Sequence, residues 1–172
     1  MFSARAFLLT GLLVLGACGF EPLYGTADRG AETEQLLSRI EVPPIADRLG
    51  QLVRTELNNR LKPRPAPQAL YAVVVTLSES TQGLAVRRDA SATRANLTIN
   101  ATFNLSAISG GENLLSGEIR SVNGYDILTS DFATLAAEKD ARRRGARDVA
   151  DAIVDRLAIY MSRAANQAPE RR

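Results

Sequence analysis

The clearest pattern along the chain is an alternation of apolar and polar residues between positions 97 and 105. A period of two predicts a β-strand with one face in the core and the other face in contact with water or a partner. The residues expected on the apolar face are Leu97, Ile99, Ala101, Phe103 and Leu105, and those expected on the polar face are Thr98, Asn100, Thr102 and Asn104.

Weaker alternations predict strands before this one. A short first strand is expected over residues 38–42, and Pro43-Pro44 ends it because proline donates no backbone hydrogen bond to a sheet. Residues 71–87 alternate with opposite parity before and after Gly83. This change of parity indicates a bulge or bend near that glycine.

The chain also predicts a hairpin after the central strand. Ser109-Gly110-Gly111-Glu112 is a turn pattern, and residues 114–122 return as another strand. Residues 124–131 are expected to form a loop. The strands therefore form a meander of antiparallel hairpins.

Two segments show the helical spacing of apolar residues. The first covers residues 46–61 and is stopped by the prolines that begin at Pro63. The second runs from 132 to 164, with Gly145 as a bend or a close packing point. Its expected apolar stripe consists of Ala146, Val149, Ala150, Ile153, Leu157, Tyr160 and Met161.

This order of elements predicts an α+β fold. Two helices would pack on one face of a small, mainly antiparallel four-stranded sheet, which makes a two-layer sandwich. We expect this domain to cover residues 35–165. An irregular tether over 18–34 would precede it, and a polar, disordered C-terminal tail over 166–172 would follow it.

The first 17 residues have the pattern of a secretory signal peptide. Arg5 precedes an apolar run over residues 6–15. Ten helical residues extend only about 15 Å, half of a hydrocarbon core of roughly 30 Å, so a stable transmembrane helix is not expected. Leu15-Gly16-Ala17-Cys18 then has the pattern of a lipobox, which predicts cleavage after residue 17 and lipidation of Cys18.

Two or three acyl chains on Cys18 would form a durable membrane anchor. Gly19 stands where an aspartate would favour retention in the inner membrane, so sorting to the outer membrane is favoured. The alternative is a soluble periplasmic protein with an incidental cysteine.

Charge and composition exclude several classes of function. Loss of the signal peptide removes one of 21 basic residues, which leaves 20 against 19 acidic ones. This balance argues against nucleic acid as a partner. The chain has no histidine, and its only lysines are Lys62 and Lys139, without a phosphate-binding glycine loop. We therefore predict a protein that is not an enzyme and has no catalytic residue, metal or cofactor.

Cys18-Gly19-Phe20-Glu21-Pro22-Leu23-Tyr24-Gly25 resembles the opening of mature lipoproteins of the LptE family, which act in lipopolysaccharide assembly. Residues 92–97 and 132–141 are similar to the same family. The resemblance implies an α+β domain in a complex with the outer-membrane β-barrel LptD, which the lipoprotein plugs. It also implies help in assembling that barrel and in delivering lipopolysaccharide to the outer leaflet.

The resemblance further implies a place at the outer membrane, lipid-anchored on the periplasmic side and within the barrel lumen. Within the anchoring segment, Phe20, Leu23 and Tyr24 either cover an edge of the domain or contact a membrane partner. An alternative function is a periplasm-facing lipoprotein that carries a lipid or serves as adaptor of an export machine. A deep apolar cavity would favour the carrier, and a closed core would favour the plug.

Two clusters of arginine are candidate sites. Arg87, Arg88 and Arg94 flank an expected turn, and arginine can bind the phosphates and carboxylates of lipopolysaccharide in a bidentate manner. The alternative is that these arginines reflect only the composition of the genome. The second cluster, on the last helix, is expected to be neutralised by acidic residues three or four positions away. It consists of Arg142, Arg143, Arg144 and Arg147, with Glu138, Asp140, Asp148 and Asp151.

The polar face of the central strand is the candidate interface with the barrel. Large barrels have interiors lined by polar side chains, which would suit such a face, although bulk water would suit it equally. The residues predicted to contact LptD are Thr98, Asn100, Thr102 and Asn104.

Overall fold

The computed structural model describes residues 27–63, 68–86 and 92–167. The signal peptide, Cys18, Arg87 and Arg88 therefore lie outside the described residues. So do the N-terminal segment with Phe20, Leu23 and Tyr24, and residues 168–172 of the expected tail. The elements are α2 (Ala27–Leu37), β1 (Ile40–Glu41), α3 (Asp47–Leu61), β2 (Tyr71–Val86), β3 (Ala92–Ala107), β4 (Asn113–Asp126) and α4 (Asp131–Gln167).

The four strands form one sheet in the order β1-β2-β3-β4. β2, β3 and β4 are successive antiparallel neighbours, and β1 runs parallel to β2 after the crossover through α3. The register of β2 and β3 shifts between Gly83 and Ala85, so the irregularity predicted near Gly83 is confirmed. The predicted α+β class with a mainly antiparallel sheet is confirmed as well.

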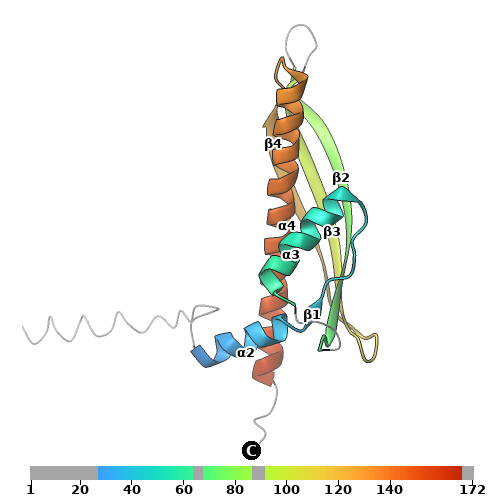
Figure 1. The fold of residues 1–172 in the computed structure, drawn as a ribbon, viewed down its shortest axis with the longest axis vertical. Coiled ribbons are helices and arrows are strands. Elements are labelled where there is room, and N and C mark those ends of the chain that lie inside the picture. The colour runs from blue at the N-terminus through green and yellow to red at the C-terminus, as the bar shows by residue number, and fades with distance from the viewer. Residues whose placement is uncertain (1–26, 64–67, 87–91, 168–172) are drawn as a thin grey trace, which may run out of the picture.

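The helices cover one face of the sheet (Figure 1). α4 lies over β3 and β4, while α3 packs mainly against α4 and reaches β2. With 37 residues at 1.5 Å each, α4 is about 55 Å long and gives the molecule its elongated shape. No helix among the described residues is long and apolar enough to cross a membrane.

The core fills the layer between the sheet and the helices. The apolar face predicted for β3 is buried there, and so is most of the stripe predicted for α4. Gly145 is a close packing point, because a Cβ on it would lie 2.6 Å from Cδ1 of Ile99. The core residues with no exposed surface include Ile40, Val53, Leu57, Val73, Leu97, Ile99, Leu105, Val149, Ile153 and Leu157.

The structure corrects the predicted end of the last strand. β4 continues to Asp126, although residues 124–131 were expected to form a loop. Asn123 and Tyr125 take the inward positions near its end. Asn123 can be buried there because its amide is hydrogen-bonded. A polar residue at a core position interrupts the apolar alternation, so the sequence pattern does not predict this part of the strand.

The structure also corrects the expected tether. Residues 27–34, the second part of the segment predicted to be irregular, belong to α2. This helix packs on α4, with Thr33 and Leu37 buried in the contact. Its own sequence is polar and short, and tertiary packing stabilises such helices more than propensity does.

Candidate functional site

The polar face predicted for β3 is on the uncovered side of the sheet. Asn100, Thr102 and Asn104 are exposed and Thr98 is half-buried. The outward positions of the neighbouring strands carry mostly short, uncharged side chains as well. These neighbours are Val74, Thr76, Ser78 and Ser80 on β2, and Ser116, Glu118, Arg120 and Val122 on β4.

We call these twelve residues the outer face. Its centre is hollowed by a shallow depression of about 430 Å³, whose walls include the side chains of Asn100, Thr102, Glu118 and Arg120. Within the described ranges, no helix packs on this side. The outer face is therefore a broad hydroxyl and amide surface with two exposed valines and two charges.

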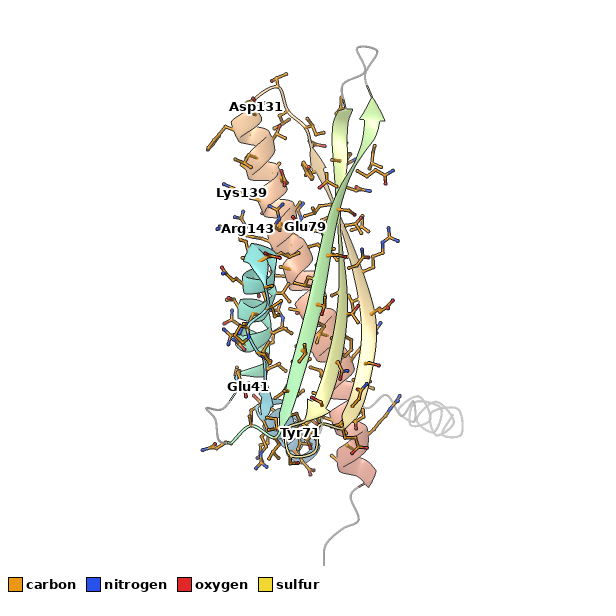
Figure 2. The ribbon with its side chains drawn as sticks, turned by 90° about the vertical axis from the view of Figure 1, so that its right-hand side faces the viewer. Glu41, Tyr71, Glu79, Asp131, Lys139 and Arg143 are labelled. Carbon is orange, nitrogen blue, oxygen red and sulfur yellow. The ribbon has the colours of Figure 1, made fainter. Side chains whose placement is uncertain are left out.

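The candidate lipopolysaccharide cluster of Arg87, Arg88 and Arg94 is only partly described. Arg94 lies on β3 near the end of the molecule that carries Asp131, which Figure 2 shows at the top. Its Nε is 3.6 Å from Oδ1 of Asp126, and both side chains are about two-thirds exposed. The register of β3 and β4 places Asp126 opposite Arg94, so this neighbour could not be predicted from spacing along the sequence.

The arginines of α4 are largely neutralised, as their spacing predicted. Arg143 and Arg144 both pair with Asp140, and Arg142 pairs with Glu138 on the helix and with Glu79 on β2. The Nε of Arg142 is 2.9 Å from Oε2 of Glu79.

Two of the acidic residues expected to pair with these arginines have other partners, because α4 faces both β4 and α3. Asp148 accepts hydrogen bonds from β4, and Asp151 pairs with Arg60 of α3. Arg147 has no ion pair with another residue of the described segments.

Hydrogen bonds from two arginines raise the pKa values of their guanidinium groups above the ordinary value. The bond to Asp151 is the largest cause for Arg60, and the bond to Glu79 is the largest cause for Arg142. Because the pKa of each arginine is higher in the folded state than in the unfolded state, its ion pair stabilises the fold fully at any pH below the unfolded-state value. This contribution is lost only as the pH rises through the folded-state value. Both arginines therefore stay charged at neutral and moderately alkaline pH.

A polar cluster joins β4 to α4 at the inner face. The Ser121 hydroxyl donates to Oδ2 of Asp148 at 2.8 Å. The Asn123 amide donates to the same oxygen at 3.2 Å and to the Ser121 hydroxyl at 2.8 Å. Every donor thus has a partner, and the cluster fixes the position of α4 along the sheet.

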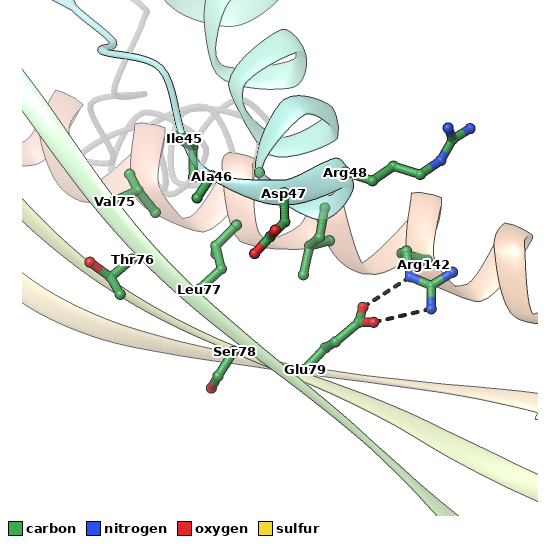
Figure 3. A pocket seen from close by; sticks show the side chains of 12 residues that line it. Ile45, Ala46, Asp47, Arg48, Val75, Thr76, Leu77, Ser78, Glu79 and Arg142 are labelled. Atoms are coloured by element: carbon green, nitrogen blue, oxygen red, sulfur yellow. Dashed lines mark hydrogen bonds and ion pairs between the residues drawn. The ribbon is translucent and has the colours of Figure 1, made fainter.

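A groove of about 400 Å³ lies between the beginning of α3 and the edge of β2 (Figure 3). Its walls are residues 45–50 on one side and residues 75–79 on the other, and Arg142 closes one end. We call it the β2-edge groove. Leu77 points into it from β2, while Thr76 and Ser78 point away. No sequence pattern indicated this groove, because it depends on how far α3 stands from the sheet.

Comparisons with known proteins agree with this fold. A lipoprotein from Caulobacter crescentus has a TM-score of 0.65 at 24% identity, over 77% of this chain and 97% of that chain. Rare lipoprotein B from Shewanella oneidensis has a TM-score of 0.53 at 18% identity, over 69% and 91%. Lipoprotein B from Nitrosomonas europaea has a TM-score of 0.55 at 15% identity, over 72% and 82%.

Among curated protein sequences, none matches this chain significantly. The family model for LptE, described as lipopolysaccharide-assembly, matches residues 37–157, which include α3, the whole sheet and most of α4. The match covers more than half of the sequence and agrees with the resemblance found in the sequence itself. The chain therefore belongs to the LptE family of lipopolysaccharide assembly.

Proposed function

We propose that this protein is an outer-membrane lipoprotein that plugs the β-barrel LptD, assists its assembly and takes part in delivering lipopolysaccharide to the outer leaflet. The observation that carries the proposal is the outer face of a chain that belongs to the LptE family. The role is non-catalytic, since the protein acts by binding its partner.

The outer face suits a wet barrel interior better than a dry protein interface. Hydroxyl and amide groups can exchange hydrogen bonds with the polar lining of a large barrel directly or through water. Val74 and Val122, each about half exposed, are the apolar contacts available on this face. Among the described residues, the buried side chains between the sheet and the helices form one cluster, and the β2-edge groove opens to the surface beside it, which supports a plug over a lipid carrier.

Affinity purification from the native host tests the proposal. The tagged lipoprotein should recover one large β-barrel in roughly equal amount from gently solubilised membranes. Replacement of Asn100 by Lys should greatly reduce that recovery, because the longer side chain fills the central depression and displaces the hydrogen bonds that this face exchanges with the barrel lining. Asn59→Lys, at an exposed position of α3, is the matched control and should recover the barrel normally. A lipoprotein recovered alone, or with inner-membrane transporter subunits, would refute the plug.

The lipid anchor is a separate part of the proposal. Cys18 carries the acyl chains, and the mature protein begins at this residue. Mass spectrometry of the purified protein should therefore show the mass of residues 18–172 plus a diacylglyceryl group and an N-linked acyl chain. Cys18→Ala should lose this added mass, and a wild-type protein that lacks it would refute the anchor.

Arg87, Arg88 and Arg94 are proposed to bind the anionic groups of lipopolysaccharide. Arg94 is largely exposed, and its contact with Asp126 is long enough to be exchanged for a phosphate. Replacement of all three by Ala should lower the affinity for lipopolysaccharide. The control replaces Arg48, Arg147 and Arg163, which are exposed and have no ion pair within the described segments. Equal affinity of both triple variants would refute the site.

A further inference from the structure

The edge of β2 is open over most of its length. β1 pairs only with Tyr71 and Ala72, because Pro43 and Pro44 lead the chain away from the sheet. The Tyr71 N–H donates towards β1, to the carbonyl of Arg39 at 3.2 Å. Since successive residues of a strand alternate, the backbone groups of residues 75 and 77 face this same edge. In the described part of the chain, no strand pairs with them.

Other parts of this edge are protected against pairing. Glu79 points to the inner side, where Arg142 holds it, and an inward charge blocks the addition of another strand. Beyond it, the register shifts after Gly83 twist the edge away. The unprotected window is therefore residues 75–78, and it coincides with the β2-edge groove.

The groove also has the side-chain features of a peptide site. Its floor is apolar, with Val75 and Leu49 buried and Leu77 half-buried. Figure 3 shows the Asp47 carboxylate above this floor, whereas Arg48 points away from it. Asp47 has a φ of 65°, a left-handed conformation that aspartate tolerates better than most residues. It forms no ion pair with any residue that the structure describes.

These features select one kind of occupant. A backbone edge pairs with an extended backbone, an apolar floor takes alternate apolar side chains, and a carboxylate takes a basic group. The first turn of α3 walls the groove opposite β2, so the edge strand of a second folded sheet would collide with it. A single extended segment of a loop or tail fits between these walls.

We propose that the β2-edge groove binds an extended segment of the barrel partner, which adds to β2 beside residues 75–78 and places a basic side chain near Asp47. This inference rests on the proposed function, because it takes the barrel as the partner. It extends the interface around the edge of the sheet, since β2 contributes Thr76 and Ser78 to the outer face and Val75 and Leu77 to the groove.

Two substitutions in the native host test the inference. Ala46 is exposed at the mouth of the groove with extended backbone, so Ala46→Trp fills the groove without entering the core. Co-purified barrel should fall by about tenfold. Asp47→Asn removes the charge but keeps a residue that tolerates the left-handed conformation, and it should give a smaller loss. Ala164→Trp, at an exposed position of α4, is the control and should leave recovery unchanged.

A photocrosslinking amino acid at position 46 identifies the occupant. It should form an adduct with one segment of the barrel protein, while the same amino acid at position 164 should form none with that segment. If the wild type recovers the barrel but Ala46→Trp recovers it equally and position 46 gives no barrel adduct, the groove inference is wrong and the plug stands. An adduct with a second copy or with another protein would also overturn it. If the wild type recovers no barrel, the proposed function itself fails.

Discussion

At the scale of single residues, Gly117 shows how closely neighbouring strands pack on the inner face of the sheet. Gly117 of β4 lies opposite Phe103 of β3, and a Cβ on it would be 2.7 Å from Cε1 of the Phe103 ring. The ring is buried, and the Arg156 guanidinium lies 6.0 Å from its centroid. Nη1 of Arg156 would itself lie 2.6 Å from the added Cβ. The absence of a side chain at position 117 thus makes room for the largest residue of the core.

We predict that Gly117→Ala destabilises the protein by about 1–3 kcal/mol, the cost of overpacking a core. This cost exceeds any gain in strand propensity, which spans about 1 kcal/mol in total. Urea denaturation of the mature domain measures it. Gly110→Ala is the control, because a Cβ there meets nothing within 4 Å, and it should change the free energy of unfolding by less than about 0.5 kcal/mol. Equal stability of the two variants would contradict the prediction.

Residue identities predicted more of the core than of the polar contacts. The alternation in β3 identified its buried residues from Leu97 to Leu105, because burial follows the strand period. It missed Ala95, which is buried two positions earlier on the same face. The partners of Asp148 and Asp151 could not be read in the same way. A helical spacing offers each of them an arginine on α4, and only the fold shows that Asp148 faces β4 and Asp151 faces α3.

At the scale of elements, α4 is held to β4 by the cluster of Asp148, Ser121 and Asn123. Ser121 and Asn123 are less than a tenth exposed, so both need a partner within the protein. Asp148→Ala leaves the Ser121 hydroxyl without its acceptor and removes one of the two acceptors of the Asn123 amide, and we predict a loss of about 1–3 kcal/mol in the free energy of unfolding. Asp155→Ala removes an exposed carboxylate from the same helix and should change it by less than about 0.5 kcal/mol. Chemical denaturation of both variants measures these free energies, and equal stability would contradict the stabilising role of the cluster.

The contact between α3 and α4 combines an apolar and an ionic part. Leu57 is fully buried there, and Leu57→Ala should cost about 2–5 kcal/mol. Arg60 joins Asp151 across the two helices, but the Asp151 side chain is 56% exposed. Arg60→Ala should therefore cost no more than about 1 kcal/mol. Thermal unfolding of both variants at low and high salt distinguishes the two contributions, because salt screens the ion pair of Arg60 but not the apolar contact of Leu57. A larger loss from Arg60→Ala would reverse this ranking.

Elements with a strong period were predictable, and elements made by tertiary contact were not. α3 and α4 follow apolar stripes, and Pro63 marks where the first of them ends. α2 shows no long apolar stripe, because its large apolar residues, Leu36 and Leu37, stand side by side at its end. Thr33 and Leu37 are buried only because the fold packs this helix on α4. The β2-edge groove could not be predicted either, because its walls come from three elements that only the assembled fold brings together.

At the scale of the whole molecule, the two faces of the sheet have different roles. The inner face with α3 and α4 supplies the stability, and the outer face is free for a partner. α4 is about 55 Å long, whereas a bilayer with its headgroups is about 40–45 Å thick. A plug aligned with the barrel axis would therefore reach from one mouth of the barrel to the other.

The position of the proposed anchor would set the direction of the proposed plug. Nine residues, 18–26, connect Cys18 to α2 and span at most about 30 Å. α2 lies at the end of the molecule that carries Tyr71 (Figures 1 and 2), and Asp131 lies at the opposite end. With the proposed anchor on the periplasmic side, the Tyr71 end should face the periplasm and the Asp131 end should face the cell exterior.

Two single cysteines test this direction. Ile108 is hydrogen-bonded to Leu70 at the Tyr71 end, and Leu128 to Thr134 at the Asp131 end; both side chains are 50% exposed. Cys18 is the sole natural cysteine and is predicted to carry lipid, so Ile108→Cys and Leu128→Cys each add one reactive thiol. Crosslinks from position 108 should map to the periplasmic mouth of the barrel, and those from position 128 to its outer mouth. Crosslinks from both positions to one mouth would show a plug lying across the barrel, and the reversed assignment would mean that the anchor does not set the direction.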